Sequence, residues 1–171
     1  TNDNDKYFMM YDVKNKDILS SKQYLNRLNN PTDWTSKILS KYVYPSRAIC
    51  EVIKTKSLTN GLSGFFVTIR YLSQNNDIKN FYHISDQIMS QNEIFSIHCF
   101  KSDREISLIK TKEKLIRSSQ GNADEIIDYA VVIECLNINK VKNFLLNNLK
   151  IKSDKKIKIN YYQLQHVMEL G

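Results

Sequence analysis

The sequence contains little of several residue types whose abundance marks whole classes of protein. It has four glycines and two prolines among 171 residues, which excludes collagen-like and low-complexity chains. It has no apolar run near the roughly 20 residues that span a bilayer, and its first residues are polar and acidic, unlike a signal peptide. We therefore expect an intracellular protein, in the cytoplasm or in the nucleus of a host cell, with no membrane partner.

Cysteine is also scarce, and its positions argue against a cofactor. The three cysteines, Cys50, Cys99 and Cys135, lie far apart, and each has apolar neighbours. An odd number of isolated cysteines is typical of buried free thiols in a reducing compartment. No CxxC or HxxxH spacing occurs, so the sequence predicts neither a zinc site nor any other bound metal or cofactor.

The common catalytic motifs are missing as well. There is no P-loop, no dinucleotide-binding glycine pattern, no GxSxG and no HExxH. His98 and Cys99 are adjacent in a predicted strand, so their side chains point to opposite faces and do not form a catalytic pair. One enzymatic alternative is left open, a phosphodiesterase built from Tyr82, His83, Asp86 and Arg117.

What is present is an ordinary globular composition with a basic bias. Hydrophobic residues make up 42% and charged residues 25% of the chain, and the formal net charge is +7. These fractions are typical of a folded domain rather than a disordered one. Isoleucine, lysine and asparagine together account for 58 of the 171 residues. Their A/T-rich codons indicate an A/T-rich genome, such as that of a large DNA virus, a phage, a low-GC bacterium or a protist.

Hydrophobic periodicity and turn signals predict a mixture of strands and helices. The predicted strands cover residues 6–13, 65–72, 94–100, 126–136 and 155–159, and a strand followed by a short helix is expected within 80–89. The predicted helices cover residues 21–28, 33–42, 105–117, 138–149 and 160–168. This order predicts an α+β fold: a small mixed or antiparallel sheet with helices packed on it and a helical N-terminal part. The glycine-containing turn at 58–64 predicts a boundary between a helical module, residues 1–57, and a basic α+β domain, residues 58–171. The alternative is a single domain in which both parts pack together.

The positive charge is concentrated in the C-terminal half. Between Lys140 and Lys158 the chain carries seven lysines against one acid, and residues 101–117 carry six cations against three acids. Such clustering is typical of a surface that binds a polyanion. The expected phosphate contacts are Lys110, Lys112, Lys114, Arg117, Lys150, Lys152, Lys155, Lys156 and Lys158. There are two alternatives. One is a solvated face whose lysines reflect a proteome rich in lysine, and the other is a surface that binds an acidic membrane or an acidic protein.

Part of the C-terminal half is similar to a known family. Residues 107–150 (SLIKTKEKLIRSSQGNADEIIDYAVVIECLNINKVKNFLLNNLK), followed by KINYYQLQHVM at 158–168, resemble the GIY-YIG-related domains of large DNA viruses and phages. The resemblance covers residues 94–168. It implies a first strand at 94–100, a turn at Lys110 and Thr111, the family's arginine at Arg117, and a loop at 121–124.

The chain departs from that family at positions that carry catalysis. Ile109 stands where the turn has glycine, no tyrosine occurs in residues 94–100, and Lys142 occupies the place of the metal-binding glutamate. A nuclease needs that carboxylate to hold a divalent cation at the scissile phosphate. The resemblance therefore implies an inactive relative that binds nucleic acid, not an enzyme.

We accordingly predict a non-enzymatic protein that binds the backbone of DNA or RNA through a basic C-terminal surface, with little sequence readout. The alternative is a protein-interaction or assembly factor, for which ten tyrosines and one tryptophan supply an aromatic interface. The sequence leaves the oligomeric state open.

Overall fold

The structure, a computed structural model, describes residues 7–43, 45–59, 61–71, 85–120, 125–148 and 157–168. The chain splits into two compact units. The sheet unit contains Thr1–Met9, Val52–Lys101 and Ile127–Gly171, and the helical unit contains Met10–Glu51 and Ser102–Ile126. These units differ from the predicted division between residues 57 and 58, because residues 102–126 join the N-terminal helices.

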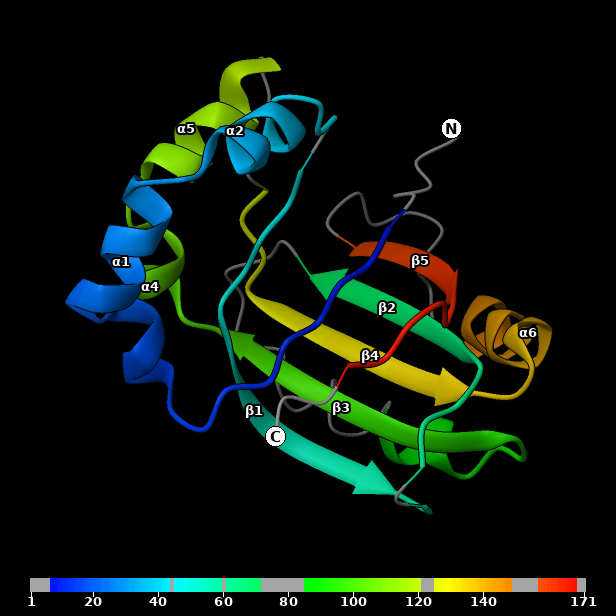
Figure 1. The fold of residues 1–171 in the computed structure, drawn as a ribbon. Helices are drawn as coiled ribbons and strands as arrows, with labels where there is room; N and C mark the ends of the chain where they lie inside the picture. Colours follow the sequence, from blue (N-terminus) through cyan, green and yellow to red (C-terminus); the bar gives the residue numbers. More distant parts are fainter. Residues whose placement is uncertain are drawn as a thin grey trace. The chain divides into compact units, whose positions relative to one another are not determined.

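Within the described residues, the sheet unit is built on five strands in the order β1-β3-β4-β2-β5 (Figure 1). The strands are β1 (Cys50–Ser57), β2 (Phe65–Tyr71), β3 (Ile94–Ser102), β4 (Tyr129–Cys135) and β5 (Ile157–Gln163). β2 pairs antiparallel with both of its neighbours, so Phe65 lies opposite Cys135 on one side and Gln163 on the other. β3 and β4 are antiparallel as well. The predicted α+β fold, an antiparallel sheet with packed helices, is confirmed.

One face of the sheet holds the hydrophobic core. The strands form where β-branched and aromatic residues cluster, and alternation sorts their side chains onto two faces. The core residues on the strands include Val67, Ile69, Ile97, Cys99, Val131, Ile133 and Cys135. The helix α6 (Ile138–Asn148) adds Val141 and Leu145, each 1% exposed. A short helix at residues 85–89 adds Ile88; the strand predicted before it lies outside the described residues.

The opposite face carries polar side chains that are nevertheless buried. Glu134 and Asn160 are 3% and 2% exposed. Nη2 of Arg70 donates a hydrogen bond to Oδ1 of Asn160 at 2.8 Å. The N-terminal segment lies against this face, where the ring centre of Phe8 is 5.4 Å from that of Tyr162 (Figure 1). Polar groups under such a cover need partners within the protein, because water does not reach them freely.

The helical unit contains short helices and 3-10 turns from two parts of the sequence. Those described are η1 (Lys16–Ser20), α1 (Lys22–Asn29), α2 (Asp33–Leu39), α4 (Arg104–Ser107), α5 (Lys112–Arg117) and η2 (Ser118–Gln120). α1 and α2 begin after residues whose side chains cap the first turn. Oγ of Ser21 accepts from the N–H of Tyr24, and Oγ1 of Thr32 accepts from the N–H of Thr35, each at 3.2 Å. These bonds satisfy donors that a first helical turn leaves without partners.

The single helix predicted over residues 105–117 is wrong, because two short helices occupy this stretch. Asp103 caps α4 by accepting from the N–H of Ile106 at 3.1 Å. Thr111 caps α5 by accepting from the N–H of Lys114 at 3.3 Å. The second cap starts a new helix inside the predicted one, so residues 108–111 form a connection instead.

Two predictions at the ends of the chain are also wrong. Residues 7–13 form no strand, and their large side chains are exposed, Tyr7 by 79% and Tyr11 by 81%. Residues 160–168 form no helix, because β5 continues to Gln163 and residues 164–168 are irregular. Pairing with β2 overrides the capping tendency of Asn160, whose side chain instead accepts the hydrogen bond from Arg70.

The packing of α6 predicts a contrast between two neighbouring leucines. Leu145 is 1% exposed in the core, whereas Leu146 is 46% exposed. Leu145→Ala removes buried methyl groups and leaves a cavity, so it should lower the free energy of unfolding by about 2–5 kcal/mol. Leu146→Ala, which is matched in chemistry, should change it by about 0.5 kcal/mol or less. Urea denaturation followed by circular dichroism measures both variants, and equal losses would contradict this placement of the core.

Candidate functional site

A small pocket in the helical unit is lined by cationic side chains and no acidic one. Its lining residues are Leu19, Tyr24, Leu25, Leu28, Arg47, Ile49, Ile106, Ser107, Ile109, Thr111, Lys114 and Arg117. The hollow leaves about 20 Å³ for the centres of water-sized groups, which is room for one or two of them. An apolar wall with a few convergent polar groups is the usual composition of a ligand site.

Tyr24 on α1 holds Arg47 in this pocket. Nη2 of Arg47 donates to Oη of Tyr24 at 2.6 Å, and Cζ of Arg47 lies 6.0 Å from the centre of the tyrosine ring. This bond uses one of the five N–H donors of a guanidinium. A side chain that is already fixed loses less conformational entropy when it binds an anion. The guanidinium of Arg47 is therefore held in place at the wall of the pocket.

Hydrogen bonds between distant parts of the sequence fix the walls of the pocket. The N–H of Ile49 donates to Oγ of Ser107 at 2.9 Å, and that hydroxyl donates to the C=O of Ile49 at 3.3 Å. Nζ of Lys114 donates to the C=O of Ser107 at 2.8 Å. The N–H of Lys112 donates to Oδ1 of Asn29 at 2.9 Å. The N-terminal helices and α4 and α5 are thereby joined around the cations.

Four of the predicted phosphate contacts lie on α5 or directly before it. Lys110 and Lys112 are exposed, and Lys114 is half-buried. Arg117 is 8% exposed. Lys114 and Arg117 both line the pocket. The structure therefore places Arg117 inside the helical unit, where a group must enter the pocket to reach it, and not on the open surface that the sequence predicts.

The remaining predicted contacts belong to the sheet unit. Lys158 is half-buried on β5. Those outside the described residues are Lys150, Lys152, Lys155 and Lys156. Two other lysines of the same cluster already have partners: Lys140 forms an ion pair with Glu93, and the ammonium of Lys142 lies 5.9 Å from the ring centre of Tyr161. Part of this positive charge is thus used within the fold.

Of the residues proposed for a phosphodiesterase, Asp86 is one whose contacts the structure describes. Tyr82 and His83 lie outside the described residues. Asp86 forms ion pairs with Lys56 and Lys54, whose hydrogen bonds lower the pKa of its carboxyl group. In the part of the chain that the structure describes, no group of three or more histidine, cysteine, aspartate or glutamate side chains is placed to hold a metal ion.

Arg47 and Tyr24 are site residues that the sequence analysis missed. Arg47 lies in an ambiguous stretch after Pro45, and 70 positions separate it from Arg117 in the sequence. Contacts across the fold, among them the bonds between Ile49 and Ser107 of α4, bring these two arginines to one pocket. The sequence offers only a weak indication of this site, an isolated arginine shortly before the strand β1.

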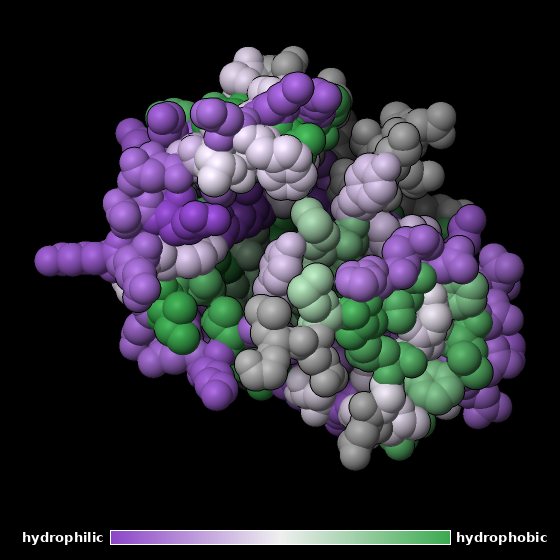
Figure 2. Space-filling view, in the orientation of Figure 1, coloured by the Kyte–Doolittle hydropathy of each residue, from purple (hydrophilic) through white to green (hydrophobic). Residues whose placement is uncertain are grey.

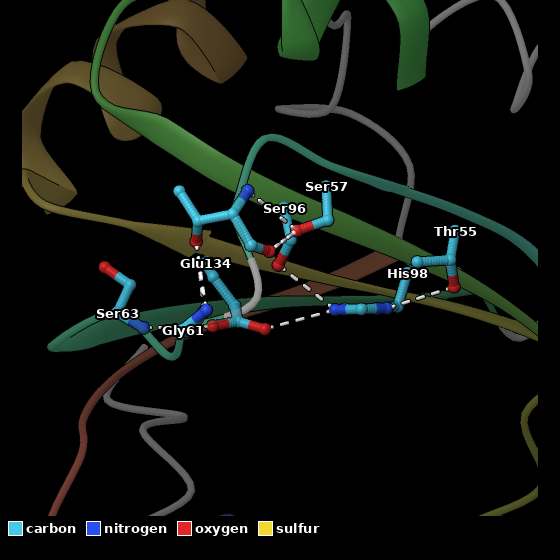
Figure 3. Close-up of polar contacts among 8 residues, drawn as sticks. Thr55, Ser57, Gly61, Ser63, Ser96, His98 and Glu134 are labelled. Atoms are coloured by element: carbon cyan, nitrogen blue, oxygen red, sulfur yellow. Dashed lines mark hydrogen bonds and ion pairs between the residues drawn. The ribbon is translucent and has the colours of Figure 1, made fainter.

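A second polar cluster lies in the sheet unit, centred on Glu134 of β4 (Figure 3). Oε1 of Glu134 is 3.1 Å from Nε2 of His98, and Oε2 accepts from the N–H of Ser63 at 3.1 Å. Nδ1 of His98 is 3.1 Å from Oγ1 of Thr55. Ser96 places its hydroxyl 3.1 Å from Nε2 of the same imidazole. Figure 3 shows the imidazole between Thr55 and Glu134.

A hydroxyl, an imidazole and a carboxylate in this order also occur in catalytic triads, where the imidazole activates the hydroxyl as a nucleophile. Here, however, the carboxylate of Glu134 is part of the hydrogen bonding that holds the fold. Glu134 is 3% exposed, and its bond to Ser63 ties the loop before β2 to β4. The hydroxyl of Ser63 also donates to the C=O of Cys135. We assign the cluster a structural role, because it supplies the hydrogen bonds without which a buried carboxylate is destabilising.

The cysteines are poorly suited to nucleophilic chemistry. Burial raises the pKa of the thiols of Cys50 and Cys99 to about 11, and it raises the pKa of Cys135 as well. A thiol with a raised pKa remains protonated near neutral pH, where the thiolate is the reactive form. All three thiols are free, as the sequence predicts.

The Glu134 cluster predicts a local effect at the amide of Ser63. Glu134→Ala removes the acceptor of that buried N–H, so hydrogen exchange at Ser63 should become faster, and the free energy of unfolding should fall by about 1–3 kcal/mol. Glu134→Gln keeps an oxygen acceptor in a side chain of the same size and should retain most of the protection. Exchange rates measured by NMR compare the two variants. Unchanged exchange in Glu134→Ala would show that this contact does not hold the loop.

The described part of the chain has no helix that is long and apolar enough to cross a membrane. No protein-family model, curated protein or solved structure matches this chain. Its function must therefore be inferred from its own residues and their geometry.

Proposed function

We propose that the protein binds the phosphate backbone of nucleic acid with little sequence readout, and that the basic surface of the helical unit makes the main contact. The convergence of Arg47, Lys114 and Arg117 on one pocket carries this proposal. Lys110 and Lys112, both exposed, flank the lining residues in the sequence. Phosphate oxygens accept hydrogen bonds from several guanidinium and ammonium groups at once, and cations clustered in this way supply most of non-specific affinity.

One acid of the same region is already neutralised. Asp103 caps α4 through the N–H of Ile106, and it pairs with Nζ of Lys16 at 3.2 Å. The backbone hydrogen bond from Ile106 and the contact with Lys16 both lower the pKa of this carboxyl group. An acid that is capped and paired repels an incoming phosphate less than a free one.

The surface of the helical unit also carries an exposed aromatic side chain. Figure 2 shows mostly hydrophilic residues over α1, α2 and α5. Trp34 on α2 is an exception, with 71% of its surface exposed, and α2 packs on α5. An exposed aromatic ring near a basic surface provides a face on which a base can stack. Trp34 is also the only tryptophan in the chain, so its fluorescence reports on this unit.

Binding of a labelled oligonucleotide should depend steeply on salt. Each neutralised phosphate contributes about one unit to the slope of log affinity against log salt concentration. Lys110→Glu combined with Lys112→Glu should weaken binding by about tenfold or more and lower the slope by about two. Reversal of Lys152, Lys155, Lys156 and Lys158, the proposed second contact, should lower it further. Fluorescence anisotropy of the oligonucleotide and quenching of Trp34 measure the effect.

The matched control is Lys22→Glu combined with Lys37→Glu. These two lysines are also exposed and belong to the helical unit, but unlike Lys110 and Lys112 neither is adjacent in the sequence to a lining residue. The control changes the net charge by the same amount. Equal weakening by both pairs would assign binding to total charge instead of this surface, and absence of binding by the unaltered protein at low salt would overturn the proposal.

A protein-interaction role is the second candidate, and the N-terminal segment favours it. Tyr7, Met9 and Tyr11 are 79%, 60% and 81% exposed. Aromatic and methionine side chains are enriched at protein interfaces, where they are frequent anchors. An acidic partner, or a second copy of the chain, would cover such a segment.

Coverage of the aromatic segment by a second copy of the chain predicts self-association. In sedimentation velocity, the unaltered protein should form dimers or larger species as its concentration rises, and Tyr7→Ser combined with Tyr11→Ser should abolish them. Tyr42→Ser, which alters a half-buried tyrosine of the helical unit, is the control. A monomer at every concentration would contradict association between copies of this chain.

A further inference from the structure

The cationic pocket is suited to one particular part of a nucleic acid. We infer that it binds a terminal phosphate, the phosphate monoester at the end of a strand, and this inference rests on the nucleic-acid binding proposed above. Along the interior of a strand every phosphate is a diester. The pocket therefore selects for strand ends, while the exposed lysines hold the backbone without regard to position.

The charge of the pocket matches a monoester better than a diester. Arg47, Lys114 and Arg117 contribute three positive charges to its lining, and the lining contains no carboxylate. A phosphate monoester carries a charge of about −1.5 to −2 at neutral pH and offers three strong acceptor oxygens. A diester carries one negative charge and offers two unesterified oxygens. The additional negative charge and the third acceptor oxygen of a monoester increase the affinity most where cations converge from different elements.

The size of the pocket favours the same group. The cavity volume is about 20 Å³, which admits one or two oxygens of a small anion and is too small for a base. Arg117 lies at the interior, 8% exposed, so a phosphate must enter to reach it. A diester continues in two directions and needs an open groove, whereas a terminal phosphate enters from one side on a single ester bond.

The hydroxyl groups of the lining add directed donors. Oη of Tyr24 accepts from Arg47, which leaves its own O–H to donate to a phosphate oxygen. The planar guanidinium of Arg47 can present two parallel N–H groups to the same phosphate. The apolar side chains Leu25, Leu28 and Ile106 complete the wall and lower the local dielectric, which strengthens these bonds.

The test compares strands that differ only at their ends. Oligonucleotides of one sequence carry a 5′-phosphate, a 3′-phosphate or hydroxyl groups at both ends, and their affinities are measured by anisotropy at one salt concentration. A phosphorylated end should bind about tenfold more tightly, the gain expected from one or two charge-assisted hydrogen bonds. The two phosphorylated strands show which end the pocket takes. Inorganic phosphate should remove this preference while leaving the hydroxyl strand bound.

Variants of the pocket separate recognition of the end from general binding. Arg47→Lys keeps the charge but loses the planar fork, and Lys114→Gln loses a charge. Both should bring the ratio of the two affinities close to one. Tyr24→Phe, which removes the hydroxyl alone, should lower the ratio in part. Lys22→Gln, an exposed lysine of the same unit, is the control and should keep the ratio. Circular dichroism confirms that each variant is folded.

The possible failures are distinguishable. Equal, salt-dependent binding of phosphorylated and hydroxyl strands would overturn the inference and leave the proposed function intact. Absence of binding by every strand would overturn both. A phosphopeptide that bound more tightly than the phosphorylated strand would also overturn the inference, because the pocket would then recognise a monoester on protein.

Discussion

The register of β2 between β4 and β5 is the constraint on which the sheet unit depends. It joins strands that are far apart in the sequence, and it sets Val67 against Ile133 and Tyr161. A slip of one residue would turn the apolar set away from α6. The same register brings Arg70 close enough to bond Asn160 on the opposite face. One pairing thus fixes both the hydrophobic core and the buried polar layer.

The helical unit depends on a different set of contacts, in which hydrogen bonds join the segment around Ile49 to the short helices α4 and α5. The paired bonds between Ile49 and Ser107, with Lys114 bonded to the C=O of Ser107, leave little freedom to the groups around the pocket. None of its helices has more than eight described residues, and helices this short are unstable alone. Their tertiary contacts therefore decide where the cations of α5 lie.

The sequence predicted what local patterns determine. The strands β2, β3 and β4 and the helices α1, α2 and α6 follow from nearest neighbours, and the structure confirms them. The failures involve non-local competition. Asn160 is a good cap in isolation, but pairing with β2 keeps it in a strand. The pocket illustrates the same limit, since its cations on α5 were predicted, while Arg47 joins them only through contacts across the fold.

The composition of the chain helps to distinguish a binding site from a general enrichment in lysine. The sequence has twenty lysines and five arginines, so an A/T-rich genome accounts for exposed lysines without any function. It does not account for arginine, which such a genome does not enrich. Two of the five arginines, Arg47 and Arg117, line one small pocket. The pocket, and not the lysine-rich surface around it, is therefore the feature of this protein that composition explains least, and the proposed anion binding rests on it.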